Sequence, residues 1–159
     1  MYKIFTDGAC IRNGKPGAKA AYGVIVTGGE FGNIDNETNL KIAGLVEPAS
    51  NNRGELTAIL VALKQSLLFQ NNNDVEIVSD SLISIKTFEE WLPKRKTKGT
   101  ASEMANYDLI EEIDELLTAN RKIKKITFTH VYSHTNDMKF INKVGNDRVD
   151  RLATALLLT

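Results

Sequence analysis

Hydrophobic and polar residues alternate in several short stretches of the chain, and this is the pattern of half-buried β-strands. The first three stretches are separated by segments rich in glycine and asparagine, which are typical of turns. The predicted strands cover residues 2–6, 21–27, 40–46, 75–79 and 124–131. The order of the first three strands along the chain indicates a meander.

Other stretches place apolar residues three or four positions apart, as on one face of an α-helix. The longest stretch follows Ser50, Asn51 and Asn52, which are helix-capping residue types, and it predicts a helix of about five turns. The remaining predicted helices cover residues 83–91, 103–120 and 145–158. Pro93 should end the first of these. The order of elements predicts an α/β fold in which helices cover the faces of a mixed sheet.

Composition narrows the class of protein. A length of 159 residues, with 42% hydrophobic and 25% charged residues, suits a single domain spanning residues 1–159. No stretch is long and apolar enough to cross a bilayer, and the first residues lack the layout of a signal peptide. Cys10 is the only cysteine, which excludes a disulfide scaffold and a cysteine zinc cluster. We expect a monomeric, intracellular and cytoplasmic protein without a membrane partner.

The formal net charge is zero, so bulk electrostatics are not expected to hold nucleic acid on this chain. Any contact with nucleic acid must therefore be local. Basic residues cluster at Lys94, Arg95, Lys96 and Lys98. A solvated surface is the alternative interpretation of this cluster, because runs of charge usually face water.

Four acids lie at or near the ends of predicted elements: Asp7, Glu55, Asp80 and Asp150. Asp7 ends the first predicted strand and Asp80 follows the fourth, and ligand sites in an open α/β sheet collect at such carboxyl ends. Glu55 lies in the first turn of the long helix, and Asp150 lies in the last helix. Mg²⁺ prefers oxygen ligands, and a pair of such ions suits phosphodiester hydrolysis.

Each of these acids also has an ordinary structural interpretation. Asp7 precedes a glycine, as in a turn, and Glu55 can complete a variant of the capping box. Asp80 can cap the helix that follows it, and Asp150 can pair with Thr154 or Arg151. Spacing alone therefore does not decide in favour of a metal site.

Five motifs occur in order along the chain: IFTDGAC, SNNRGELTAI, VSDS, HVYSHT and GNDRVDRLA. Together they resemble type 1 ribonuclease H, and the resemblance spans nearly the whole chain. It implies a ribonuclease H-like fold, with a mixed five-stranded sheet of three antiparallel and then parallel strands, flanked by helices. It also implies an endonuclease that hydrolyses the RNA strand of RNA–DNA hybrids by a two-metal-ion mechanism and leaves 5′-phosphate and 3′-hydroxyl ends.

The resemblance assigns the metal ligands. In that family four acids coordinate two Mg²⁺ ions, for which Mn²⁺ can substitute. Their counterparts here are Asp7, Glu55, Asp80 and Asp150. Asp147 lies one helical turn before Asp150 and competes for the fourth place, but the match favours Asp150. Asp147 is interpreted instead as an acid of the first helical turn, where the helix dipole favours negative charge.

The two histidines are His130 and His134. A strand separates residues four apart by about 13 Å, too far for both to bind one metal ion. We interpret His130 as a sheet or surface residue. The resemblance places His134 in a loop where the family carries a histidine that assists proton transfer or product departure, a role suited to a titratable imidazole.

The resemblance also implies contacts with the hybrid. Amide side chains donate and accept hydrogen bonds, which suits the sensing of a 2′-hydroxyl. The residues matched to this task are Asn13, Asn51 and Asn52. The residues matched to the family's pocket for a phosphate of the DNA strand are Ser50 and Asn106. The residues matched to its basic protrusion along the DNA backbone are Trp91, Lys94, Arg95 and Lys96. Burial in the core is the alternative for Trp91.

Two other functions fit the same fold. An inactive hybrid-binding module should lack one or more of the four acids, and none is missing. A DNA-processing nuclease or strand transferase would keep the acids, but the Asn-rich helix start and the basic protrusion favour hybrid cleavage. The leading hypothesis is therefore a magnesium-dependent ribonuclease H.

Overall fold

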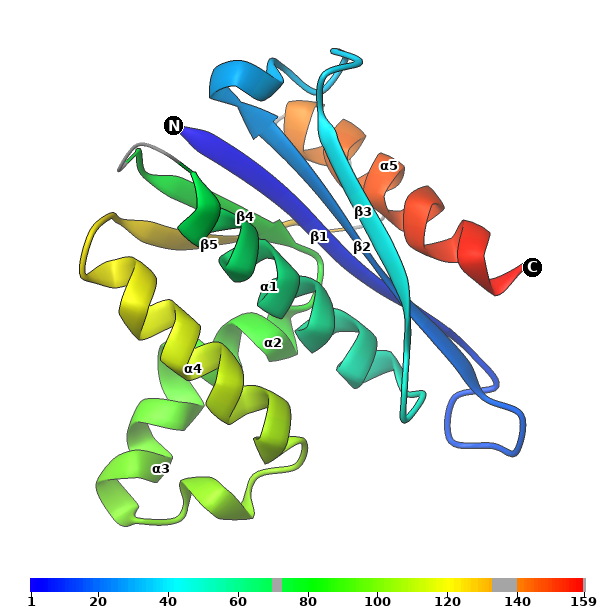
Figure 1. Cartoon of the computed structure of the whole chain (residues 1–159). Helices are drawn as coiled ribbons and strands as arrows, with labels where there is room; N and C mark the ends of the chain where they lie inside the picture. The colour runs from blue at the N-terminus through cyan, green and yellow to red at the C-terminus, as the bar shows by residue number, and fades with distance from the viewer. Residues whose placement is uncertain (70–72, 133–139, 159) are drawn as a thin grey trace.

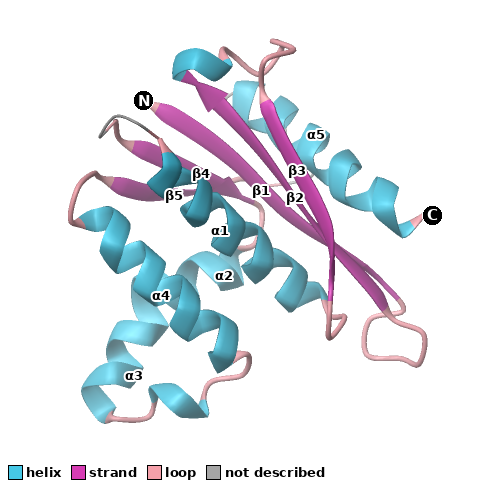
Figure 2. Cartoon of the chain, in the orientation of Figure 1, coloured by secondary structure: helices cyan, strands magenta, loops and turns pink. Residues whose placement is uncertain are grey.

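A five-stranded mixed sheet with strand order β3-β2-β1-β4-β5 forms the centre of the molecule (Figures 1 and 2). It is seen in a computed structural model that describes residues 1–69, 73–132 and 140–158. The strands are β1 (Tyr2–Ile11), β2 (Lys19–Gly28), β3 (Leu40–Val46), β4 (Val75–Ser79) and β5 (Ile126–His130). β1, β2 and β3 are antiparallel neighbours, while β4 pairs parallel with β1 and β5 pairs parallel with β4. The predicted α/β fold with its mixed sheet is confirmed.

The pairing register gives Asp7 a position that the sequence did not predict. β1 pairs with β4 only as far as Thr6, which lies opposite Ser79, but its pairing with β2 continues to Ile11. The prediction that Asp7 ends the first strand was therefore wrong. Asp7 is the first β1 residue beyond the carboxyl end of β4, where the two strands part. Asp80 follows β4 at the same point.

Helices cover both faces of the sheet. The helices are α1 (Asn51–Leu68), α2 (Leu82–Lys86), α3 (Leu92–Lys98), α4 (Tyr107–Arg121) and α5 (Phe140–Leu157). Figure 1 shows α1 and α4 in front of the sheet and α5 behind it. Because side chains alternate along β1, Ile4 packs into the core beneath α1 and α4, whereas Phe5 packs beneath α5. No helix within residues 1–69, 73–132 and 140–158 is long and apolar enough to span a membrane.

Two glycines let helices approach the sheet closely enough to form the site. A Cβ atom on Gly8 would overlap the backbone of α1 at Glu55, and a Cβ atom on Gly145 would overlap the ring of Phe5. The first contact holds the beginning of α1 against β1, next to Asp7. The second holds α5 against the opposite face of the same strand.

Three predicted helix boundaries were wrong. Pro93 does not end its helix, because α2 passes through a π-helical turn at Thr87–Trp91 into α3, where proline occupies the first turn. α4 begins four residues later than predicted, since Asn106 adopts a left-handed conformation with φ 61°. α5 begins at Phe140, five residues before the predicted start at residue 145. Asp147 therefore lies in the interior of α5, and its assignment to the first helical turn was wrong.

Candidate metal centre and substrate-contact surface

Three of the four predicted acids meet at the carboxyl end of β4. One carboxylate oxygen from each of Asp7, Glu55 and Asp80 lies within 4.8 Å of the others. β1 supplies the first, the second turn of α1 supplies the second, and the residue after β4 supplies the third. α1 begins at Asn51, so the prediction that Glu55 lies in the first turn of its helix was wrong. We call this group the acid cluster. Its oxygen-only donor set is the chemistry that hard divalent cations prefer.

Burial and mutual repulsion make the acid cluster unfavourable as three free carboxylates. Asp7 is 3% exposed and Glu55 is 7% exposed. Burial, followed by the charges of the neighbouring acids, raises the pKa of Asp7 to about 11 and that of Glu55 to about 8. Burial also raises the pKa of Asp80. The Glu55 Oε2 atom is buried and has no hydrogen-bond partner among the described residues. A cation would relieve both the repulsion and this unpaired oxygen.

Asp150 lies beside the acid cluster without being one of its three members. It is exposed on α5, and its hydrogen bond and charge are among the causes that raise the pKa of Asp7. Its charge also raises the pKa of Glu55 and Asp80. Asp147 is not among the principal charges acting on any of the three. These electrostatic interactions favour Asp150 over Asp147, and its role as fourth ligand stays a prediction.

Two residues that the sequence interpretation did not assign to the site contact Asp80. Asn146 is 4% exposed, and its side chain hydrogen-bonds to Asp80 and opposes the rise in its pKa, which burial dominates. The Nε2 atom of His130 lies 3.2 Å from the backbone oxygen of Asp80. His130 is a sheet residue, as predicted, but parallel pairing places it opposite Ser79. The i, i+4 spacing of Asn146 and Asp150 was the available sequence signal for the first contact.

His134, predicted to assist proton transfer, lies outside the described residues. The amides predicted to sense the 2′-hydroxyl gather at the start of α1. The backbone N–H of Asn51 donates to Asn13 Oδ1 at 3.2 Å, which holds the β1–β2 loop against the helix. Ser50 caps α1 by accepting a hydrogen bond from the backbone N–H of Arg53 at 3.1 Å.

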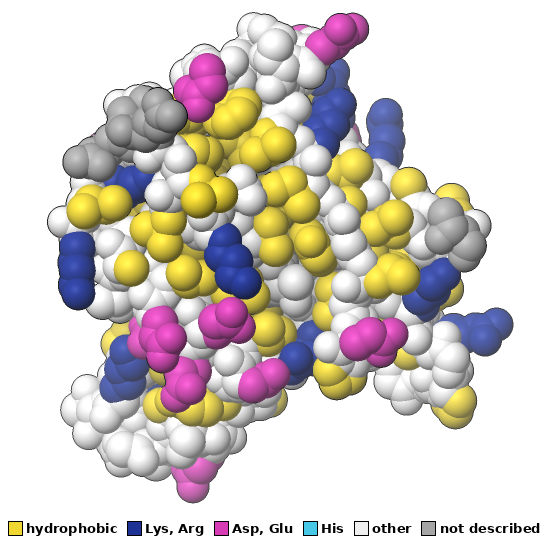
Figure 3. Space-filling view, viewed as in Figure 1, with side chains coloured by type: hydrophobic (Ala, Val, Ile, Leu, Met, Phe, Trp, Pro, Cys, Tyr) yellow, Lys and Arg dark blue, Asp and Glu magenta, His cyan; other side chains and the backbone are white. Residues whose placement is uncertain are grey.

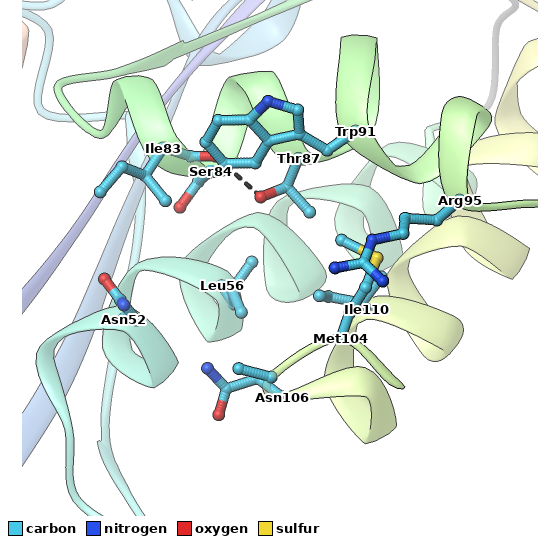
Figure 4. A pocket seen from close by; sticks show the side chains of 11 residues that line it. Asn52, Leu56, Ile83, Ser84, Thr87, Trp91, Arg95, Met104, Asn106 and Ile110 are labelled. Atoms are coloured by element: carbon cyan, nitrogen blue, oxygen red, sulfur yellow. Dashed lines mark hydrogen bonds between the residues drawn. The ribbon is translucent and has the colours of Figure 1, made fainter. Parts of the chain in front are cut away.

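A hollow of about 230 Å³ lies between the start of α1, the α2–α3 segment and the residues before α4 (Figure 4). We call it the α1–α4 hollow. Its polar lining includes Asn52 and Asn106, and its apolar lining includes Leu56 and Trp91. Trp91 is 40% exposed, so the alternative of burial in the core was wrong.

The basic residues near Trp91 differ in their surroundings. The residues that line an adjoining hollow are Trp91, Lys94, Arg95, Lys98 and Met104. Lys96 instead pairs with Asp114 of α4. On the face seen in Figure 3, acidic side chains gather over α4, which makes this side of α4 unfavourable for phosphates.

A mixed sheet with helices on both faces and a carboxylate cluster where two neighbouring parallel strands part defines an α/β protein with a candidate divalent-metal centre. Residues 1–157 match the model of the RNase H family. The chain therefore belongs to the RNase H family of ribonucleases.

Relatives by sequence carry the same family name. The chain is 34% identical over 154 residues to a ribonuclease H of Schizosaccharomyces pombe, covering 94% of this chain and 50% of that protein. It is 32% identical over 156 residues to a ribonuclease H of Acetivibrio thermocellus, covering 95% and 90%. The chain thus spans half of the first relative and nearly all of the second.

Solved structures share the fold at lower identity. The solution structure of the RNase H domain of prototype foamy virus has a TM-score of 0.75 at 21% identity, over 97% of this chain and 92% of that one. LC11-RNase H1, solved in complex with an RNA/DNA hybrid, has a TM-score of 0.64 at 18% identity over the full length of both chains. These similarities support the fold.

Proposed function

We propose that this protein is a Mg²⁺-dependent endonuclease that hydrolyses the RNA strand of RNA–DNA hybrids and leaves 5′-phosphate and 3′-hydroxyl ends. The observation that carries the proposal is the acid cluster, in which oxygens of Asp7, Glu55 and Asp80 lie within 4.8 Å of one another. Family membership and the hybrid-bound relative LC11-RNase H1 support the substrate.

The carboxylates of the acid cluster are better suited to binding divalent ions than to remaining without a bound cation. Its members would hold Mg²⁺, with Asp150 as the fourth ligand and Mn²⁺ as a substitute. When bound, two such ions lower the pKa of the attacking water and stabilise the leaving oxygen of the phosphodiester. The protein contributes the negative charge, together with the hydrogen bond of Asn146 to the Asp80 side chain and the contact of His130 with the Asp80 backbone oxygen. The Asn146 hydrogen bond would help to orient the Asp80 carboxylate.

The start of α1 is proposed to select the hybrid. Asn13, Asn51 and Asn52 present amide groups that can donate to and accept from a 2′-hydroxyl. Trp91, Lys94 and Arg95 lie on the exposed side of the α2–α3 segment, where an aromatic ring and cations suit a DNA backbone. His134 is proposed to assist proton transfer or product departure.

The test is cleavage of end-labelled RNA–DNA hybrid, duplex DNA and duplex RNA, each with Mg²⁺ or with chelator. Only the RNA strand of the hybrid should be cut, and only with metal. Asp80→Asn should abolish turnover, while Asp147→Asn, a matched change on α5, should leave it near normal. Cutting of duplex DNA would support a DNA-processing nuclease instead, and cutting in chelator would refute the metal mechanism.

A further inference from the structure

Arg53, two residues before Glu55, is anchored across the fold to the start of α4. Its guanidinium donates two parallel hydrogen bonds to the Asp108 carboxylate, from the two terminal nitrogens, at 3.0 and 2.9 Å. The Arg53 side chain is 14% exposed, and its Nε atom has no partner among the described residues. This forked pairing fixes the plane of the guanidinium. It also neutralises the charge locally, so Arg53 is poorly suited to attract a distant anion.

The same guanidinium orients Asn106. One terminal nitrogen of Arg53 lies 3.3 Å from Asn106 Oδ1. A guanidinium can only donate hydrogen bonds, so the amide oxygen of Asn106 must face Arg53 and the amide nitrogen must face away. In Figure 4 the side-chain nitrogens of Asn106 and Asn52 point toward each other across the α1–α4 hollow. These two amide nitrogens therefore offer hydrogen-bond donors to a ligand in the hollow.

The backbone at Asn106 explains why its side chain is available for this role. Asn106 precedes the first residue of α4 in a left-handed conformation, and its side chain makes no capping hydrogen bond. Its backbone oxygen instead accepts from the N–H groups of Leu109 and Ile110, both at 3.0 Å. The amide is therefore held by Arg53 rather than by the helix that it begins.

We propose that Arg53 is a positioning residue that sets the hydrogen-bonding polarity of the α1–α4 hollow. By holding the Asn106 oxygen, it makes this hollow accept a phosphate oxygen of the DNA strand and reject groups that only donate. The inference rests on the proposed hybrid cleavage. It assigns Arg53 and Asp108 to recognition through Asn106, without contact between Arg53 and the substrate.

Three variants separate orientation from packing. Asn106→Asp keeps the size of the side chain, tolerates positive φ and retains an oxygen for Arg53, but it turns a second oxygen toward the hollow. Asn106→Gly removes the side chain and also tolerates positive φ. Arg53→Lys keeps the charge but loses the fork that holds both Asp108 and Asn106. Arg121→Lys is the matched control, because its ion pair with Glu89 lies outside the site.

The experiment measures cleavage of hybrids whose DNA strand carries one neutral methylphosphonate, moved through successive positions. In the wild type, the methylphosphonate should raise KM about tenfold at one position of the DNA strand. This is the expected cost of losing one charge-assisted hydrogen bond. In Asn106→Asp, Asn106→Gly and Arg53→Lys, KM for the unmodified hybrid should rise by a similar factor. The methylphosphonate penalty should disappear in all three, and kcat should change less than twofold.

Two results overturn the role of Arg53 and Asn106. One is a methylphosphonate penalty that persists at the same position in all three variants. The other is a KM for the unmodified hybrid that is the same in the wild type and the variants. A fall in kcat with unchanged KM also overturns this role. If the wild type itself fails to cut the unmodified hybrid, the proposed function fails first. Thermal melts of each variant accompany the kinetics, and if Arg53→Lys does not fold, the two Asn106 variants still decide the question.

Discussion

Removing one charge from the acid cluster should stabilise the metal-free protein. Two unit charges 4.8 Å apart repel by about 3.5 kcal/mol at an effective dielectric constant of about 20. Protonation limits this cost. A pKa of Glu55 raised from 4.5 to about 8 costs folding about 3 kcal/mol at pH 7. The charge of Asp80 is the second cause of that rise, after burial. Asp80→Asn should therefore recover about 1–2 kcal/mol, or about 3–6 °C in Tm.

The sign of this effect depends on pH. A carboxyl whose pKa is raised by folding costs no stability below its unfolded pKa, and the cost grows as pH rises toward the folded pKa. For Glu55 this window runs from 4.5 to about 8. The difference in Tm between Asp80→Asn and the wild type should thus be near zero at pH 4 and largest near pH 8.

The assay is thermal unfolding followed by circular dichroism in chelator, from pH 4 to pH 8. Asp147→Asn is the control, because it removes an acid from α5 that does not act principally on the cluster. Adding Mg²⁺ should make the Tm of the wild type higher than that of Asp80→Asn, because the wild type binds the ion and the variant binds it weakly. A Tm of Asp80→Asn at or below that of the wild type in chelator at pH 8 would refute the electrostatic reasoning.

Three further predictions concern Asn146, Trp91 and Gly145. Asn146→Ala should raise the Mg²⁺ concentration for half-maximal cleavage by about 10-fold, because it frees Asp80, and a metal titration tests this. Trp91→Ala should raise KM for the hybrid about 5–100-fold through lost base or sugar stacking, with unchanged kcat, in steady-state kinetics. Gly145→Ala should destabilise the protein by about 1–3 kcal/mol in urea unfolding, since the added methyl overlaps the Phe5 ring; an unchanged midpoint would contradict this.

Periodicity predicted the elements but not where special backbone geometry changes them. The alternation around residues 2–6 identified β1, yet the strand continues because pairing with β2 supports residues that β4 no longer reaches. Pro93 is tolerated because a π-helical turn precedes it, and no local pattern marks such a turn. The left-handed Asn106 delays α4 in the same way. The errors at Asp7 and Asn106 lie at the acid cluster and in the lining of the α1–α4 hollow.

The acids and the residues that support them differ in how far the sequence can reveal them. Asp7, Glu55 and Asp80 lie at or near the ends of predicted elements, but only the family motifs mark them as candidate metal ligands. By contrast, the fork between Arg53 and Asp108 joins residues 55 positions apart. Arg53 stands in the motif SNNRGELTAI, but the motif does not indicate its partner, and Asp108 stands in none of the five motifs. The consequence of the fork is the direction of one amide, which only the packing of α1 against α4 decides. Family motifs can therefore indicate which acids gather at a site, whereas the contacts that orient its donors are set by tertiary packing.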